Sequence, residues 1–152
     1  MRAVIQRVAS ASVSIDGTMV GSIGKGYLVL LGVGQADTEQ EVERLWSKIF
    51  KLRIFPEGDK ATGSSLADVG GAVLVVSQFT LFADCRKGNR PSFSAAGDPI
   101  ESERLYQLFV ERARRDVAQV ETGEFGADMM VSLENDGPFT ICLDTDELSR
   151  PR

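Results

Sequence analysis

Two short strings in this 152-residue chain hold the residues best suited to chemistry. Hydroxyl and amide groups lie together in Ser77-Gln78-Phe79-Thr80, at the end of an apolar run, and Gly137-Pro138 lies between two apolar stretches near the C-terminus. The chain has no histidine, the side chain best suited to proton transfer near neutral pH. Any hydrolytic chemistry must therefore rely on hydroxyls, an amide, backbone N–H groups and the substrate itself.

The composition narrows the kinds of site that the chain can build. Without histidine there is no Ser-His-Asp or Cys-His pair. Cys85 and Cys142 lie far apart in the sequence, and no carboxylate cluster has metal-ligand spacing, so we expect neither a metal nor another cofactor. The glycines near the N-terminus match no nucleotide-binding string. Thr80 is the obvious side-chain nucleophile, but no base is visible to activate it.

The net charge of −5 argues against a general nucleic-acid-binding protein, because phosphate affinity comes largely from lysine and arginine. A local basic cluster nevertheless lies at Arg86, Lys87 and Arg90. Its residues could bind phosphates, or they could simply belong to a solvent-exposed loop without a binding function. No apolar run approaches the roughly 20 residues that span a bilayer, and no signal peptide is apparent. With two cysteines and no disulfide framework, we expect a cytoplasmic protein with no membrane partner.

The apolar pattern predicts one α/β domain over residues 1–152, with a mixed, barrel-like sheet and two main helices in the order strands, helix, strand, helix, strands. One helix begins at the capping box Thr38-Glu39-Gln40-Glu41, and the other at Asp98-Pro99. The continuous apolar run at 72–78 is typical of a strand that is buried on both faces. Residues 56–71 are expected to form a loop with little regular structure. Other strands are expected at 1–15, 19–23, 27–33, 52–55, 129–134 and 139–143.

Taken together, the motifs resemble the D-aminoacyl-tRNA deacylases of the widespread bacterial and eukaryotic type. The resemblance covers nearly the whole chain and is carried, in the expected order, by Met1–Val8, Ser77–Leu81, Lys87–Phe93 and Asn135–Thr140. That family cleaves the ester between a D-amino acid and the 3′ end of tRNA, and it also removes glycine mischarged on tRNA-Ala. The resemblance implies a hydrolase that proofreads for translation and binds the 3′ end of aminoacyl-tRNA.

The resemblance also implies how the two strings work. It implies a homodimer with active sites at the interface, where the cis Gly137-Pro138 peptide of one subunit enters the site of the other. Its carbonyl groups would reject an L-side chain and accept a D-amino acid or glycine. Backbone N–H groups of Phe79 and Thr80 are expected to stabilise the oxyanion, while Ser77 and Gln78 hold the terminal adenosine. The substrate's 2′-hydroxyl is expected to assist the attack.

Two other classes of function remain open at this point. A threonine-nucleophile hydrolase of a small ester would use Thr80 without RNA, whereas a non-catalytic oligomeric binding module would use both strings for packing and turns. Taken residue by residue, Phe79, Leu81 and Phe82 are expected to belong to the core rather than to a site. In the deacylase, Arg86, Lys87 and Arg90 contact the tRNA.

Overall fold

The first strand of the chain, β1 (Arg2–Ile15), organises the sheet, as seen in a computed structural model that describes residues 1–152. Along one edge of β1 runs β8 (Met130–Asp144), antiparallel. Along its other edge, β3 (Gly26–Gly32) and β2 (Thr18–Ile23) pair with successive halves of β1. The sheet continues from β3 with two parallel strands, β6 (Ala72–Ser77) and β7 (Val120–Thr122). The predicted mixed sheet is confirmed.

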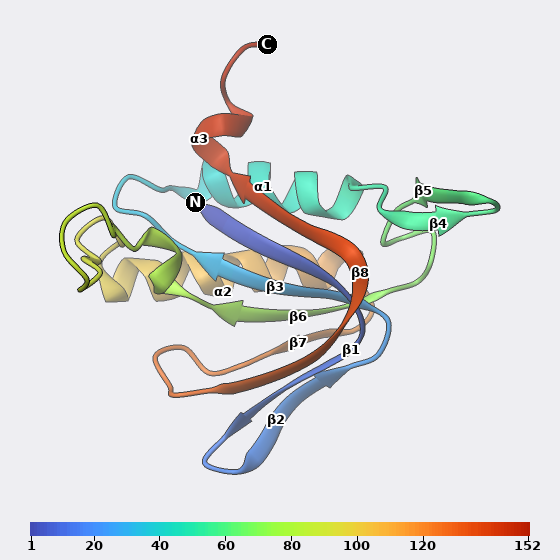
Figure 1. Ribbon diagram of the computed structural model, residues 1–152, viewed down its shortest axis with the longest axis horizontal. Coiled ribbons are helices and arrows are strands. Elements are labelled where there is room, and N and C mark those ends of the chain that lie inside the picture. Colours follow the sequence, from blue (N-terminus) through green and yellow to red (C-terminus); the bar gives the residue numbers. More distant parts are fainter.

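The sheet curls on itself, so that β2 comes close to β6 and β7 (Figure 1). A side chain at Gly21 of β2 would place its Cβ only 2.7 Å from the Thr122 carbonyl oxygen, so the two ends can approach this closely only with glycine there. Eight buried side chains, among them Val13, Leu28 and Leu74, fill the inside of the curl. The barrel-like core that the sequence predicts is therefore confirmed.

Two helices cover the other face of the sheet, and both begin where the sequence predicts. α1 (Glu39–Lys51) starts with the Thr38 capping box, in which the Thr38 and Glu41 side chains satisfy backbone N–H groups reciprocally. α2 (Pro99–Asp116) starts with the Asp98 side chain, which accepts from the next free N–H groups of the helix. A short third helix, α3 (Thr145–Leu148), follows β8.

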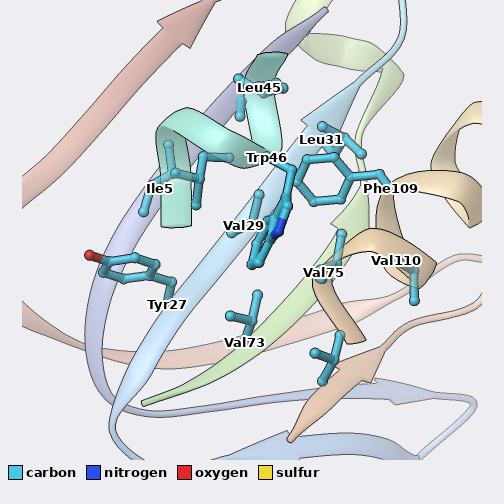
Figure 2. Close-up of a cluster of buried hydrophobic side chains, with 14 of the residues drawn as sticks. Ile5, Tyr27, Val29, Leu31, Leu45, Trp46, Val73, Val75, Phe109 and Val110 are labelled. Carbon is cyan, nitrogen blue, oxygen red and sulfur yellow. The ribbon is translucent and has the colours of Figure 1, made fainter. Parts of the chain in front are cut away.

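The main core lies between these helices and the sheet and holds 23 buried residues. Figure 2 shows Trp46 of α1 next to Phe109 of α2, above side chains of β3 and β6. Their rings meet edge to face with centroids 5.6 Å apart, and the indole N–H of Trp46 donates to Asp116 at 2.8 Å. β6 is buried on both faces, as predicted for the run at 72–78, because one core lies on each side of it, but the strand ends at Ser77.

Several predicted boundaries are wrong. Residues 56–71 are not a plain loop, because β4 (Phe55–Glu57) and β5 (Lys60–Ser64) form a hairpin there. Its exposed polar residues lack the apolar alternation that identifies a half-buried strand. The strand expected at 52–55 begins only at Phe55, and neither β7, with three residues, nor α3, with four, was predicted. No helix of the chain is long and apolar enough to cross a membrane.

The two strands expected at 129–134 and 139–143 are one strand, β8, whose pairing is interrupted in the middle. Asn135 lies opposite Val8 and Thr140 lies opposite Gln6, so residues 136–139 have no partners in β1. These four residues form a bulge within β8, which we call the 136–139 loop. It contains Gly137-Pro138, and the sequence signal for two strands came from this interruption.

Candidate active site

The Ser77-Gln78-Phe79-Thr80 string lies where β6 ends and a short 3-10 helix, η1 (Phe79–Phe82), begins. The Gln78 N–H donates to the Leu31 carbonyl at 2.7 Å, which carries the pairing with β3 one residue past the strand. The Gln78 side chain donates to the Thr80 hydroxyl at 2.5 Å. Because the first N–H groups of a helix have no acceptor within it, those of Phe79 and Thr80 are not used by η1.

Arg2 fixes η1 against the ends of the long strands. Its guanidinium donates to the Leu81 carbonyl at 3.0 Å, lies over the Phe82 ring at 4.5 Å and pairs with Asp144 at 2.9 Å. The Phe82 ring also lies so close to Gly34 that a Cβ there would be 2.9 Å from it. Contacts from Arg2 and Gly34 therefore fix η1, and with it the turn that carries the Ser77-Gln78-Phe79-Thr80 string.

A cleft of about 500 Å³ opens beside this string. Such a volume is within the usual range for small-ligand sites. Ser77, Gln78 and Phe79 line the cleft, but Thr80 does not. Ser102 and Asp128 add polar groups, and the remaining lining residues are mostly apolar or glycine: Val33, Val76, Ala96, Gly97, Pro99, Phe125, Gly126, Ala127, Met129 and Val131.

Two parts of this lining were not predicted from the sequence: the start of α2 and the segment between β7 and β8. Phe125 of that segment packs against Tyr106, with ring centroids 5.9 Å apart. The Tyr106 hydroxyl donates to the buried Val75 carbonyl at 2.9 Å, and burial raises the pKa of Tyr106 to about 12. The available signal was an apolar pair, Phe125 and Met129, of which only Met129 lies in a predicted strand, at 129–134.

Phe79 is not a core residue, so the prediction that placed it in the core is wrong. Its side chain is 57% exposed and its ring meets the Phe93 ring edge to face, with centroids 5.1 Å apart. Ile100, at the start of α2, is 82% exposed. Leu81 and Phe82 are half-buried. Exposed apolar side chains thus lie on segments that line the cleft or adjoin them.

The second string lies in the 136–139 loop, and the peptide between Gly137 and Pro138 is cis. Arg7, which is only 5% exposed, lies beneath the loop. Its guanidinium donates to the carbonyl oxygens of Asp136 at 3.0 Å, Gly137 at 3.3 Å and Ile54 at 2.5 Å. It also pairs with the Asp136 carboxylate at 3.1 Å and lies over the Phe139 ring at 4.5 Å. One buried cation therefore fixes most of the loop.

Asn135 closes the loop at its base. Its side-chain amide lies within donating distance of the carbonyl oxygens of Arg7, at 3.0 Å, and of Phe139, at 3.2 Å, and of the Gln6 side-chain oxygen, at 3.1 Å. The Thr140 hydroxyl donates to the same Gln6 oxygen at 2.5 Å. Both ends of the loop are thus joined to β1 by side chains where the backbone pairing fails.

The two strings lie level with opposite ends of β3, because Arg7 pairs with Tyr27 and Ser77 pairs with Leu31. Ser77 of β6 pairs with Leu31, and the neighbouring Gly32 pairs with Arg2, so the first string lies level with Arg2 of β1. The 136–139 loop lies over Arg7 of the same strand. Five residues of β1 separate these positions, a distance of about 17 Å at the rise of an extended strand. Figure 1 shows the bend of β8 and η1 on opposite sides of the sheet's length. The chain's own Gly137-Pro138 does not line the cleft.

The basic cluster lies in the long loop between η1 and α2. Arg86, Lys87 and Arg90 are all exposed. Arg86 forms a two-pronged ion pair with Asp84, at 2.9 and 2.7 Å, and this pairing lowers the pKa of Asp84 to about 2. A bridge from Ala96 to Gly34 ties the loop to the end of β3, next to the cleft. Lys87 and Arg90 are therefore the cations left free there.

The groups that converge on the cleft are hydroxyls, an amide and one carboxylate. No three Cys, Asp or Glu side chains come together as a metal site would require. Cys85 and Cys142 are unpaired and exposed. The arrangement is suited to binding a polar ligand with an apolar part and to stabilising charge with backbone N–H groups.

Comparison with known proteins gives consistent matches. The family model described as D-Tyr-tRNA(Tyr) deacylase matches residues 4–144. A D-aminoacyl-tRNA deacylase from Clostridium botulinum (strain 657 / Type Ba4) is 54% identical over 95% of this chain and 97% of its own. A solved structure named c-Myc DNA Unwinding Element Binding Protein has a TM-score of 0.89 and 40% identity, over 95% of this chain and 98% of its own. A probable eukaryotic D-amino acid tRNA deacylase shares the fold, with a TM-score of 0.82 and 17% identity over 93% of this chain and 97% of its own.

Proposed function

The chain belongs to the D-aminoacyl-tRNA deacylase family, and we propose that its cleft binds the 3′ end of a D-aminoacyl-tRNA and hydrolyses the ester there. The observation that carries the proposal is the position of the Ser77-Gln78-Phe79 string at the edge of a cleft of ligand size. Water attacks the ester carbonyl, the bond to the ribose oxygen breaks, and the free amino acid and tRNA leave. The same chemistry removes glycine from tRNA-Ala.

In this proposal the string acts by position and charge. The N–H groups of Phe79 and Thr80, which η1 does not use, stabilise the negative oxygen that forms during the attack. Ser77 and Gln78 hold the terminal adenosine, and the neighbouring 2′-hydroxyl of the substrate assists the water. Thr80 is not the nucleophile. Its hydroxyl accepts from Gln78 and does not line the cleft, and the chain has no histidine to activate it.

We propose that chiral selection comes from a second copy of the chain in a homodimer. Because the two strings lie about 17 Å apart along the direction of β1 within one subunit, they act on one substrate only if another subunit supplies the 136–139 loop. Gly137 and Pro138 are exposed, and the exposed Phe79 and Ile100 give the cleft region an apolar surface for a partner to cover.

The loop then acts as a wall beside the substrate's α-carbon. An L-amino acid would direct its side chain into the backbone of Gly137-Pro138, whereas a D-amino acid directs it away and glycine has none. The loop can exclude L-side chains only if its backbone is rigid. The hydrogen bonds from Arg7 and Asn135 fix its backbone in place. Arg86, Lys87 and Arg90, on the loop next to the cleft, contact tRNA phosphates, and Lys87 and Arg90 carry most of that contact.

The proposal is tested by incubating the purified protein with matched D- and L-aminoacyl-tRNA and with glycyl-tRNA-Ala. We expect release of the D-amino acid and of glycine, and little release of the L-amino acid. A parallel reaction with a chelator should proceed at the same rate. Equal rates on the D- and L-substrates would contradict the chiral wall, and no hydrolysis of any aminoacyl-tRNA would contradict the activity itself.

A further inference from the structure

Four of the chain's five lysines come from three separate segments at one end of the molecule. Lys25 lies in the turn between β2 and β3, Lys48 and Lys51 lie in the last turn of α1, and Lys60 begins β5. Figure 1 shows these segments at the same end, close to the bend of β8. All four side chains are exposed. We call these four residues the lysine cluster.

The lysine cluster lacks carboxylate partners within the chain. None of its members forms an ion pair, although ten ion pairs hold other cations of the chain. Arg53, between α1 and β4, adds a fifth cation and pairs with Glu57 at 3.6 Å. Asp59 and Asp68 are the other carboxylates of these segments, and Asp136 of the 136–139 loop pairs with Arg7, so the cations outnumber the carboxylates at this end. In a chain of net charge −5, this end is locally positive.

Helix stability explains only part of this arrangement. Lys48 and Lys51 complement the negative end of the α1 dipole, as basic residues in a last turn often do. Lys25 and Lys60 belong to no helix, yet they lie at the same end. The Lys25 ammonium lies over the Phe55 ring, 5.5 Å from its centroid. Lys25 therefore contacts β4, the strand that follows α1.

The lysine cluster is structurally connected to the 136–139 loop. Ile54, three residues after Lys51 and directly before Phe55, offers its carbonyl oxygen to Arg7 at 2.5 Å. The same guanidinium donates to the Gly137 carbonyl at 3.3 Å. Arg7 therefore links the segment that carries Lys51 to the 136–139 loop, so the lysine cluster and the loop lie at the same end of the subunit.

We propose that the lysine cluster of one subunit binds backbone phosphates of the tRNA whose 3′ end occupies the cleft of the other subunit. This role rests on the proposed function, in which the 136–139 loop enters the partner's cleft and brings the lysines with it. The stem of a tRNA that leaves that cleft then passes a surface of unpaired cations. Lysine suits this contact because it binds phosphates as a point charge without reading sequence.

The test compares the Lys51→Gln/Lys60→Gln double variant with a matched control, Arg150→Gln/Arg152→Gln, which removes the same charge near the C-terminus. Each protein hydrolyses full-length D-aminoacyl-tRNA and a minimal substrate, the same D-amino acid esterified to a CCA trinucleotide, over a range of salt concentrations. We expect the lysine variant to raise KM for the tRNA roughly 10-fold at low salt. The slope of log KM against log salt concentration should fall by the amount that corresponds to about one to two lost phosphate contacts. The kcat of the variant, and both constants for the minimal substrate, should stay at wild-type values.

Lys51→Arg/Lys60→Arg should restore the KM and the salt slope for tRNA. A wild-type KM and salt slope in the glutamine variant would overturn the proposal, as would an equal loss in the control. An equal loss on the minimal substrate would overturn it too, because the lysines would then act on the site itself. Failure of the wild-type protein to hydrolyse either substrate would instead count against the proposed function.

Discussion

The buried guanidinium of Arg7 donates to the carbonyl oxygen of Gly137 at 3.3 Å, although 130 residues separate the two in the sequence. The same side chain donates to the Asp136 carbonyl and lies over the Phe139 ring, so it contacts three of the loop's four residues. A planar, permanently charged fork of donors is suited to holding several carbonyl oxygens at once. Arg7 is therefore a positioning residue for the 136–139 loop.

Replacing Arg7 by lysine should loosen this loop. Lysine keeps the charge but cannot reach three carbonyl oxygens in a plane, so we expect a loss of about 1–3 kcal/mol in stability and a larger loss in chiral discrimination. The measurements are the unfolding free energy and the ratio of D- to L-substrate hydrolysis. Arg53→Lys, at an exposed arginine that also donates to a carbonyl, is the control. An unchanged ratio in Arg7→Lys would show that the loop does not need this support.

Gly137→Ala should separate the function of the loop from its folding. A Cβ at Gly137 would meet only the Asn135 side-chain oxygen, at 3.6 Å, and this is an ordinary contact. We therefore expect a wild-type Tm and sharply reduced hydrolysis of D-aminoacyl-tRNA, because the added methyl group would lie beside the substrate's α-carbon. Thermal unfolding and single-turnover rates check the two parts. Full activity in this variant would remove Gly137 from the proposed site.

Mixing subunits should reveal whether the site is shared. Gln78→Ala alters the cleft and Gly137→Ala alters the loop, and each homodimer should be nearly inactive. After dissociation and reassociation of an equal mixture, about a quarter of the sites would combine an intact cleft with an intact loop. We expect activity to return to that level. If both strings acted within one subunit, the mixture would remain as inactive as its components.

The nucleophile is tested by changing the enzyme and the substrate separately. Thr80→Ala should retain substantial activity, because the Thr80 hydroxyl has no base to activate it and does not line the cleft. A tRNA ending in 2′-deoxyadenosine should bind but react far more slowly. Rapid-quench analysis checks for an acyl-enzyme. A dead Thr80→Ala variant with a trapped acyl-enzyme would establish covalent catalysis and leave the deacylase activity standing.

The two tyrosines of the chain should respond oppositely to loss of their hydroxyls. The Tyr27 hydroxyl is buried with no hydrogen-bond partner, so Tyr27→Phe should stabilise the fold by about 1 kcal/mol. The Tyr106 hydroxyl donates to the Val75 carbonyl, so Tyr106→Phe should cost about 1 kcal/mol. Chemical denaturation at neutral pH measures both values. Destabilisation of similar size in both variants would contradict the difference in their hydrogen bonding.

The same variants should change the alkaline limit of stability. Burial raises the pKa of Tyr106 to about 12, from 10.0 in the unfolded chain, and it raises the pKa of Tyr27 as well. The protonated phenols therefore favour the folded state fully below pH 10, and this contribution is lost as the pH rises from 10 towards 12. Each phenylalanine variant should lose less stability than the wild type over that interval. An identical alkaline decline in all three proteins would contradict this assignment.

Local patterns in the sequence predicted the two main helices, the central strand and the family. The Thr38 capping box, Asp98-Pro99 and the apolar run at 72–78 each depend on neighbouring residues, so the elements they predict formed where expected. The strings around Ser77 and Gly137 likewise carried the resemblance that the comparisons confirm. The hairpin at 55–64 was missed because its exposed residues carry no apolar period.

The relative positions of the two strings and the residues around them could be read only from the folded chain. Their separation of about 17 Å along β1 depends on the register of β1 with β3 and β8, which no local pattern encodes. The lining by Phe125 and Ser102 and the burial of Arg7 under Gly137 likewise join residues remote in the chain. Such contacts arise when separate elements pack on a common core, so the assembly of the site is a property of the folded sheet.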